Sequence, residues 1–152
     1  MTDKVERQYF KSYLAMIDNS VGTEMFRSFY VRVNDGPVTD IIGSGENACA
    51  FYVSTILLVF GKQKSVHATV KSVITDLEES GWELVDENDM KAGDVIVWSG
   101  RDDDNPSQHI GFYIGDNLAI STSSNEQKVF KHDIHFGQVQ RKIMSVYRSQ
   151  NW

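Results

Sequence analysis

The chain contains one thiol, Cys49, and four imidazoles, which belong to His67, His109, His132 and His135. A cysteine nucleophile needs a lowered thiol pKa, a base within hydrogen-bond reach and stabilisation of the oxyanion that forms on attack. A lone cysteine is otherwise a small apolar filler of the core. The surroundings of Cys49 therefore decide between chemistry and packing.

Cys49 stands at the beginning of an almost wholly apolar stretch, residues 48–60, which follows a glycine-rich loop at 43–47. Because apolar residues would cover all sides of a helix here, the stretch predicts a buried helix that ends at Gly61. Its content of β-branched residues is also compatible with a strand. At a helix start, free backbone N–H groups and the helix dipole favour a thiolate and can face an oxyanion. This position therefore supplies two of the three requirements.

His109 is the best candidate for the base. It is the first residue of a predicted strand that directly follows a long polar loop, residues 99–108. At such a position the strand provides a rigid support while the adjacent loop leaves the side chain exposed. His67, near the start of a predicted helix, is expected to be a solvated surface residue. The Asp102-Asp103-Asp104 run is expected to be a solvated loop, since it lacks the glycine spacing of a calcium site. No metal or cofactor is predicted.

The elements that must position these residues fall into two halves. In the first half of the chain, the pattern predicts helices over residues 3–17, 48–60 and 66–80, the first with an Asp3/Glu6 capping box and the last capped by Ser65. It also predicts one hairpin, with strands over 28–33 and 38–42 and a turn at Asn34-Asp35-Gly36-Pro37. The second half predicts short strands at 95–98, 109–114, 118–122, 128–130 and 142–147. Helices followed by an antiparallel sheet make an α+β fold. A length of 152 residues fits one domain over 1–152.

Composition excludes several classes of protein. Apolar residues make up 41% and charged residues 24%, as in an ordinary globular domain. A net charge of -6 argues against a nucleic-acid binder and against adhesion to an anionic membrane. No apolar run approaches the roughly 18 residues of a membrane span. The polar N-terminus lacks the layout of a signal peptide, so we expect a cytoplasmic protein or export by another route.

Four motifs, in this order, resemble the NlpC-type cell-wall peptidases and the related CHAP-domain amidases. They are Cys49-Ala50-Phe51-Tyr52-Val53, Gly81-Trp82, Ala92-Gly93-Asp94-Val95-Ile96-Val97-Trp98 and His109-Ile110-Gly111-Phe112-Tyr113-Ile114-Gly115. The resemblance implies a papain-like fold with Cys49 as nucleophile and His109 as base. It also implies hydrolysis of amide bonds in the peptide stems of peptidoglycan.

The chain departs from this superfamily at two positions. Where the endopeptidases usually carry Asp before the nucleophile, this chain has Ala48, and the aromatic pair after Cys49 is closer to the CHAP pattern. Twelve residues after the base, where the family places His, Asn or Gln, stands Ser121. Its hydroxyl can accept a hydrogen bond from the imidazole and hold its tautomer; His132, a water or a backbone carbonyl are the alternatives.

The leading hypothesis is a cysteine hydrolase that cleaves a peptide or amide through an acyl-enzyme. The serine at position 121 and the missing Asp motivate a second hypothesis, a non-catalytic module that binds a peptide or another ligand on the same fold. An acyltransferase or deamidase, which shares the acyl-enzyme and differs in the acceptor, is the third. Oligomeric state is not indicated.

Overall fold

The computed structural model describes residues 2–43, 47–101 and 107–152. Most of the glycine-rich loop at 43–47 and the Asp102-Asp103-Asp104 run lie outside the described residues. The predicted α+β plan is confirmed: helices pack against a six-stranded antiparallel sheet of order β3-β8-β4-β5-β6-β7. Its strands are β3 (Glu83–Leu84), β4 (Val95–Trp98), β5 (His109–Gly115), β6 (Leu118–Ser123), β7 (Lys128–Asp133) and β8 (Ile143–Arg148).

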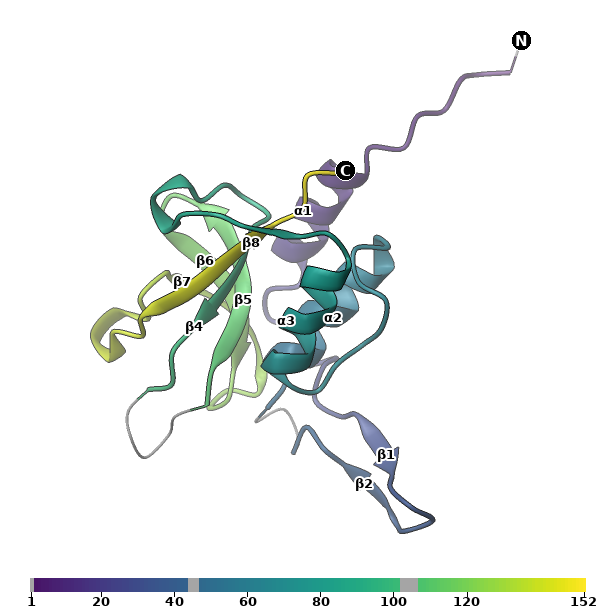
Figure 1. The fold of residues 1–152 in the computed structure, drawn as a ribbon, viewed down its shortest axis with the longest axis vertical. Helices are drawn as coiled ribbons and strands as arrows, with labels where there is room; N and C mark the ends of the chain where they lie inside the picture. Colours follow the sequence, from purple (N-terminus) through teal and green to yellow (C-terminus); the bar gives the residue numbers. More distant parts are fainter. Residues whose placement is uncertain (1, 44–46, 102–106) are drawn as a thin grey trace.

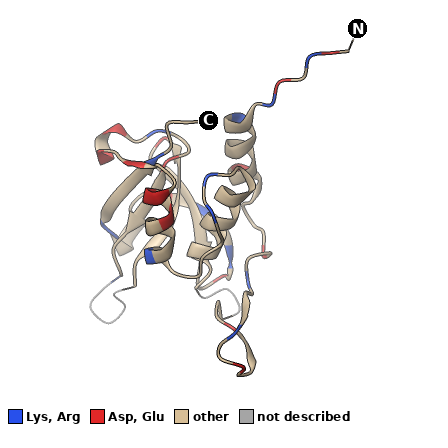
Figure 2. Cartoon of the chain, turned by 45° about the vertical axis from the view of Figure 1, so that its right-hand side comes forward, with Lys and Arg blue, Asp and Glu red and all other residues tan. Residues whose placement is uncertain are grey.

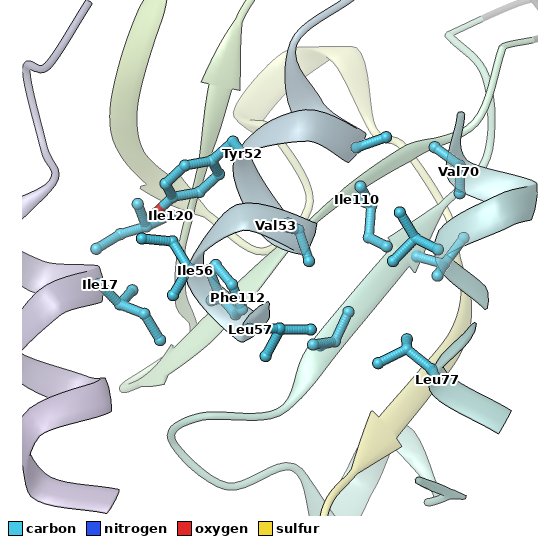
Figure 3. Packing of buried hydrophobic residues seen from close by; sticks show 14 of the residues in the cluster. Ile17, Tyr52, Val53, Ile56, Leu57, Val70, Leu77, Ile110, Phe112 and Ile120 are labelled. Atoms are coloured by element: carbon cyan, nitrogen blue, oxygen red, sulfur yellow. The ribbon is translucent and has the colours of Figure 1, made fainter. Parts of the chain in front are cut away.

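The three helices lie together beside the sheet (Figure 1), and they are α1 (Tyr9–Asn19), α2 (Cys49–Val59) and α3 (Val70–Glu79). The apolar stretch that begins at Cys49 is a helix rather than a strand. Its inner side chains, Tyr52, Val53 and Leu57 among them, pack against Phe112 of β5 in the core (Figure 3). Because β5 also carries His109, this packing holds the two predicted catalytic elements against each other.

Two predicted helix starts are wrong. The first helix begins at Tyr9, not at residue 3. Residues 2–8 are exposed, and the side chain of Val5 is 85% exposed, so this segment has no packing partners. A helical turn without packing partners does not form on propensity alone. The third begins at Val70, where the Thr69 hydroxyl accepts from the N–H of Ser72, so Thr69 rather than Ser65 is the cap. No helix within the described parts of the chain is long and apolar enough to cross a membrane.

The predicted hairpin is confirmed and projects from the body of the molecule (Figure 1), although its strands are short: β1 (Tyr30–Arg32) and β2 (Val38–Asp40). Its turn places Asn34 and Asp35 at positive φ, a conformation that these residue types tolerate. In the sheet, β7 is longer than predicted and takes in His132, while the two-residue strand β3 and the short 3-10 helices η1 (Glu87–Asp89) and η2 (Gly137–Val139) were not predicted.

Candidate active site

Cys49 and His109 line one groove of about 930 Å³. Cys49 is the first residue of α2, and the residue before it, Ala48, offers no side-chain cap, so the backbone N–H groups of the helix start are left for other partners. His109 is the first residue of β5, on which α2 packs. The structure therefore brings together the thiol and the imidazole that the sequence selected.

The electrostatics of Cys49 differ from the prediction. Burial raises the pKa of the partly buried thiol, and this effect outweighs the N–H groups of Ile110, Ala50 and Cys49 itself and the charge of Arg141, all of which lower it. The predicted favouring of a thiolate by the helix start is present but does not prevail. The resting group is a neutral thiol.

His109 is likewise neutral at rest. Burial lowers its pKa well below the usual value, and the positive charges of Arg141 and Arg101, together with His132, lower it further. Its Nε2 lies 2.9 Å from the Ser121 hydroxyl, which leaves Nδ1 as the nitrogen available to the thiol. No direct hydrogen bond joins the Cys49 thiol to an imidazole within the described residues. In unliganded enzymes such bonds often form only with substrate.

Ser121 joins His109 to a second histidine. Its hydroxyl, fully buried on β6, also lies 2.8 Å from Nε2 of His132 on β7. Nδ1 of His132 lies 2.7 Å from the backbone carbonyl of Asp133. Of the candidates for the third position, the structure thus places both Ser121 and His132 in one hydrogen-bonded chain behind His109.

The backbone carbonyl fixes the direction of every proton in this chain. A carbonyl only accepts, so Nδ1 of His132 must donate to Asp133 O, and Nε2 of neutral His132 is then an acceptor. The Ser121 hydroxyl therefore donates to His132 and accepts from Nε2–H of His109. This leaves Nδ1 of His109 unprotonated, the tautomer that a general base for Cys49 needs.

Aromatic rings hold His132 in this orientation. Its ring stacks on Phe136 at a centroid distance of 3.9 Å and on Phe130 at 4.6 Å. Trp98, fully buried, lies 5.6 Å from His132 and 5.8 Å from His109. This apolar enclosure is the main reason that the pKa of His132 is lowered, because burial disfavours its charged form.

Gly111 lets the two strands of the site approach. A Cβ built at Gly111 would lie 2.7 Å from Cβ of Ser121 and 2.7 Å from the carbonyl oxygen of Ile120, closer than real Cβ atoms come. The glycine of the His-x-Gly motif is therefore required where β5 passes Ser121, and it keeps that hydroxyl within reach of His109.

Arg141 is a site residue that the sequence analysis missed. It lies between η2 and β8, lines the groove and is 8% exposed. One guanidinium N–H donates to the carbonyl of Ser99 over 3.0 Å, and the group lies over the ring of Phe136. No local pattern marks it, because the carbonyl that holds its guanidinium, that of Ser99, lies 42 positions earlier in the chain.

The two remaining histidines do not join the site. His67 precedes α3 rather than lying on it, and its Nε2 is 2.7 Å from a carboxylate oxygen of Asp76, so the prediction of a solvated helix residue is wrong. Asp76 also accepts from the backbone N–H groups of Lys64 and Ser65, which makes this a structural cluster. His135 is exposed and lies outside the groove.

Comparisons with known proteins agree with this architecture. The model of the NlpC/P60 family matches residues 57–148, a range that takes in His109, Ser121, His132 and Arg141 and begins after Cys49. The comparison with curated proteins found no match.

Two solved structures from Trichomonas vaginalis share the fold. NlpC2 has a TM-score of 0.56 and 18% identity over 98% of this chain and 51% of its own. NlpC1 has a TM-score of 0.56 and 18% identity over 96% of this chain and 47% of its own. The chain thus spans about half the length of these structures, and the predicted papain-like fold of the NlpC type is confirmed.

Proposed function

The chain belongs to the NlpC/P60 family, and from this premise we propose that it is a cysteine hydrolase that cleaves an amide bond through an acyl-enzyme on Cys49. The observation that carries the proposal is the His109–Ser121–His132 chain, which presents an unprotonated Nδ1 on the wall of the groove that also holds the thiol. Members of the family are in general cysteine peptidases of the cell wall. We therefore infer the peptide stems of peptidoglycan as substrate.

The reaction starts from a neutral thiol and a neutral imidazole. As the Cys49 sulfur attacks the carbonyl carbon, its proton passes to Nδ1 of His109, and the oxyanion forms near the N–H groups that begin α2. His109 returns the proton to the leaving amine when the C–N bond breaks, which leaves a thioester. Water, deprotonated by His109, then hydrolyses the thioester and restores the thiol.

Ser121 and His132 act through His109. Protonation of His109 at Nδ1 produces an imidazolium whose Nε2–H still donates to the Ser121 hydroxyl. That hydroxyl remains an acceptor because it donates to His132, which the Asp133 carbonyl orients. The chain therefore serves both protonation states of the base. Ser121 and His132 are positioning residues, in place of the single imidazole or amide that the family resemblance implies.

Mass spectrometry of peptide products tests the proposal. Purified peptidoglycan is first cut with a muramidase to give soluble stem-peptide fragments, which are then incubated with the protein and with Cys49→Ala. The expected result is fragments formed by addition of one water across an amide bond with the parent protein and none with the variant. Products that carry an added amine or peptide instead identify a transferase. Unchanged fragments, or equal cleavage by Cys49→Ala, contradict the proposal.

A second candidate is a module that binds peptides without cleaving them. It is favoured by the raised pKa of the Cys49 thiol and by the lack of a direct thiol–imidazole hydrogen bond in the described structure. The two functions separate in one comparison. Binding of the muramidase-released fragments that persists in Cys49→Ser, together with no turnover by the parent protein, supports the binding module. Turnover by the parent protein excludes it.

A further inference from the structure

A second cavity, of about 360 Å³, lies on the face of the sheet that turns away from the helices. Tyr113, which lines it, packs with Trp98, whereas its neighbour Phe112 packs with the helices on the other face. None of the described residues that line this cavity lines the groove of Cys49. Its volume is in the range of small-molecule sites, about 300–1,000 Å³, so the molecule offers a second place for a ligand.

The floor of the cavity is apolar and is held firmly in place. Ile134, 8% exposed, belongs to the buried cluster of this face, and Met90 and Ile143 pack against that cluster. The backbone N–H of Ile134 donates to the carbonyl of Asn117 at 3.0 Å. Its carbonyl accepts from the indole N–H of Trp98 at 2.7 Å. A ligand therefore finds this floor already formed and spends little free energy on ordering it.

The Tyr113 hydroxyl is a buried donor without an acceptor. The side chain is 9% exposed, and its oxygen accepts a long hydrogen bond of 3.5 Å from the backbone N–H of Asn117. Among the described residues, no group accepts the proton of this hydroxyl. A buried tyrosine hydroxyl usually finds a partner, because leaving it unpaired costs free energy. An oxygen atom of a ligand in the cavity supplies the acceptor that is missing here.

The rim of the cavity is polar, and its described residues include no Lys or Arg. Glu87 provides a carboxylate, Asn117 a carboxamide and His135 an imidazole. These three side chains are exposed and form no hydrogen bond or ion pair with another described residue. Helix η1 also carries Asp89 and begins after Asp86, and Figure 2 shows the acidic residues of this loop. The rim is therefore free to bind a ligand with hydrogen-bond donors and acceptors, but it repels anions.

These groups together fit a saccharide. The hydroxyls of a sugar both donate and accept hydrogen bonds, so they can donate to Glu87 and accept from Tyr113. The C–H groups of the sugar ring are apolar and can pack on Ile134 and Ile143. Other classes of ligand fit less well. An ammonium cannot accept from the Tyr113 hydroxyl, an anion is repelled by Glu87, and an apolar ligand leaves these polar groups unpaired.

The cavity lies on the same face of the sheet as the proton chain of the active site. Side chains alternate along β5, so His109, Gly111 and Tyr113 point to one face. Trp98, which packs with Tyr113 on this face, lies 5.8 Å from His109. A polymer that occupies the cavity is therefore held on the face that carries the reaction centre.

We propose that the cavity is a saccharide-binding exosite, and that its ligand is the glycan of the peptidoglycan whose stem peptides the groove cleaves. The identity of the polymer rests on the proposed function, whereas the sugar site does not depend on turnover. A bound glycan raises the effective concentration of its own stem peptides at Cys49. The exosite therefore contributes to the cleavage of intact peptidoglycan and not to that of free peptides.

Backbone amide NMR with chitotriose, a trimer of N-acetylglucosamine, tests the site without turnover. The expected result is saturable shifts at Asn117, Ile134 and His135 and none at the residues around Cys49. Cellotriose, which lacks the acetamido groups, distinguishes a glycan of the peptidoglycan type from other saccharides. Binding of cellotriose as tight as that of chitotriose overturns the assignment of the polymer. The absence of a saturable shift with either sugar overturns the exosite.

Variants assign the binding to the cavity. Tyr113→Phe removes only the hydroxyl, and Glu87→Gln removes the charge of an exposed side chain; each should raise the Kd for chitotriose about three- to tenfold. Tyr30→Phe and Glu6→Gln make the same changes at exposed residues outside the cavity, and these matched controls should leave the Kd unchanged. A Kd that stays at the parent value in both cavity variants overturns the proposal.

Rates on two substrates test the role of the exosite. The parent protein and Tyr113→Phe are compared on intact peptidoglycan and on stem peptides that an amidase has freed from the glycan. Tyr113→Phe should slow the cleavage of intact peptidoglycan about threefold or more and leave that of the free peptides unchanged. Equal slowing on both substrates, or on neither, overturns this role. Sugar binding without hydrolysis of either substrate instead contradicts the proposed function and leaves the saccharide site standing.

Discussion

Replacing Ser121 with alanine removes the hydroxyl that orders the protons of the site. Two hydrogen bonds are lost, one of 2.9 Å to His109 and one of 2.8 Å to His132. A hydrogen bond between neutral groups contributes about 0.5–1.5 kcal/mol, so the pair contributes about 1–3 kcal/mol to holding His109 in its productive tautomer. Because about 1.4 kcal/mol is a factor of ten, the acylation rate should fall roughly 5- to 150-fold.

The release of p-nitrophenolate from p-nitrophenyl acetate measures acylation without knowledge of the natural substrate, with Cys49→Ala as the blank. His132→Gln keeps an oxygen that can accept from Ser121 and should retain most of the rate. His132→Leu cannot accept and should resemble Ser121→Ala. His135→Gln, outside the groove, is the matched control and should leave the rate unchanged.

Nitrogen NMR separates an effect on the tautomer from a general loss of structure. In the parent protein the proton of neutral His109 should reside on Nε2 and that of His132 on Nδ1, as the Asp133 carbonyl dictates. Ser121→Ala should remove the preference at His109 while the remaining spectrum is retained. A parent-like acylation rate in Ser121→Ala, or a proton on Nδ1 of His109 in the parent protein, refutes the reasoning.

Three further predictions follow from the same structure. Burial lowers the pKa of His109, so the imidazole stays neutral below the usual histidine pKa of about 6.5. The acylation rate should therefore decline only at pH values below about 6.5, and a decline centred at or above about 6.5 contradicts this prediction. Gly111→Ala should slow acylation by about tenfold or more, since its Cβ displaces Ser121, and an unchanged rate in a folded variant excludes the close approach as the reason for the glycine. Thr69→Ala should lower the free energy of unfolding by about 0.5–2 kcal/mol in urea denaturation while Ser65→Ala changes it little; the reverse order assigns the cap to Ser65.

The nucleophile, its helix and the strand of the base could be predicted because their signals are local. The apolar stretch after Cys49 predicts a buried helix whatever elements it packs against. The His-x-Gly motif at His109 indicates a strand. The spacing to Ser121 came from the family resemblance. In the structure Ser121 lies 2.9 Å from His109, and Cys49 lines the same groove as His109.

Features that depend on contacts distant in sequence could not be predicted. The link to His132 requires the β6–β7 register that pairs Ala119 with His132, which no periodicity specifies. Arg141 is held in the groove by the carbonyl of Ser99, 42 positions earlier in the chain. The raised thiol pKa at Cys49 arises from burial, a tertiary effect that the helix start alone does not reveal.

The covalent intermediate on Cys49 tests the central claim most directly. Muramidase-released stem peptides are mixed with the protein, the reaction is stopped with acid within the first turnover, and the protein is digested and mapped by mass spectrometry. The account predicts a stem-peptide acyl group on the fragment that contains Cys49, a much smaller amount in His109→Ala, and none in Cys49→Ala. Cleavage of the stem peptides that proceeds at the parent rate in Cys49→Ala, with no acyl group on the parent protein, would contradict it.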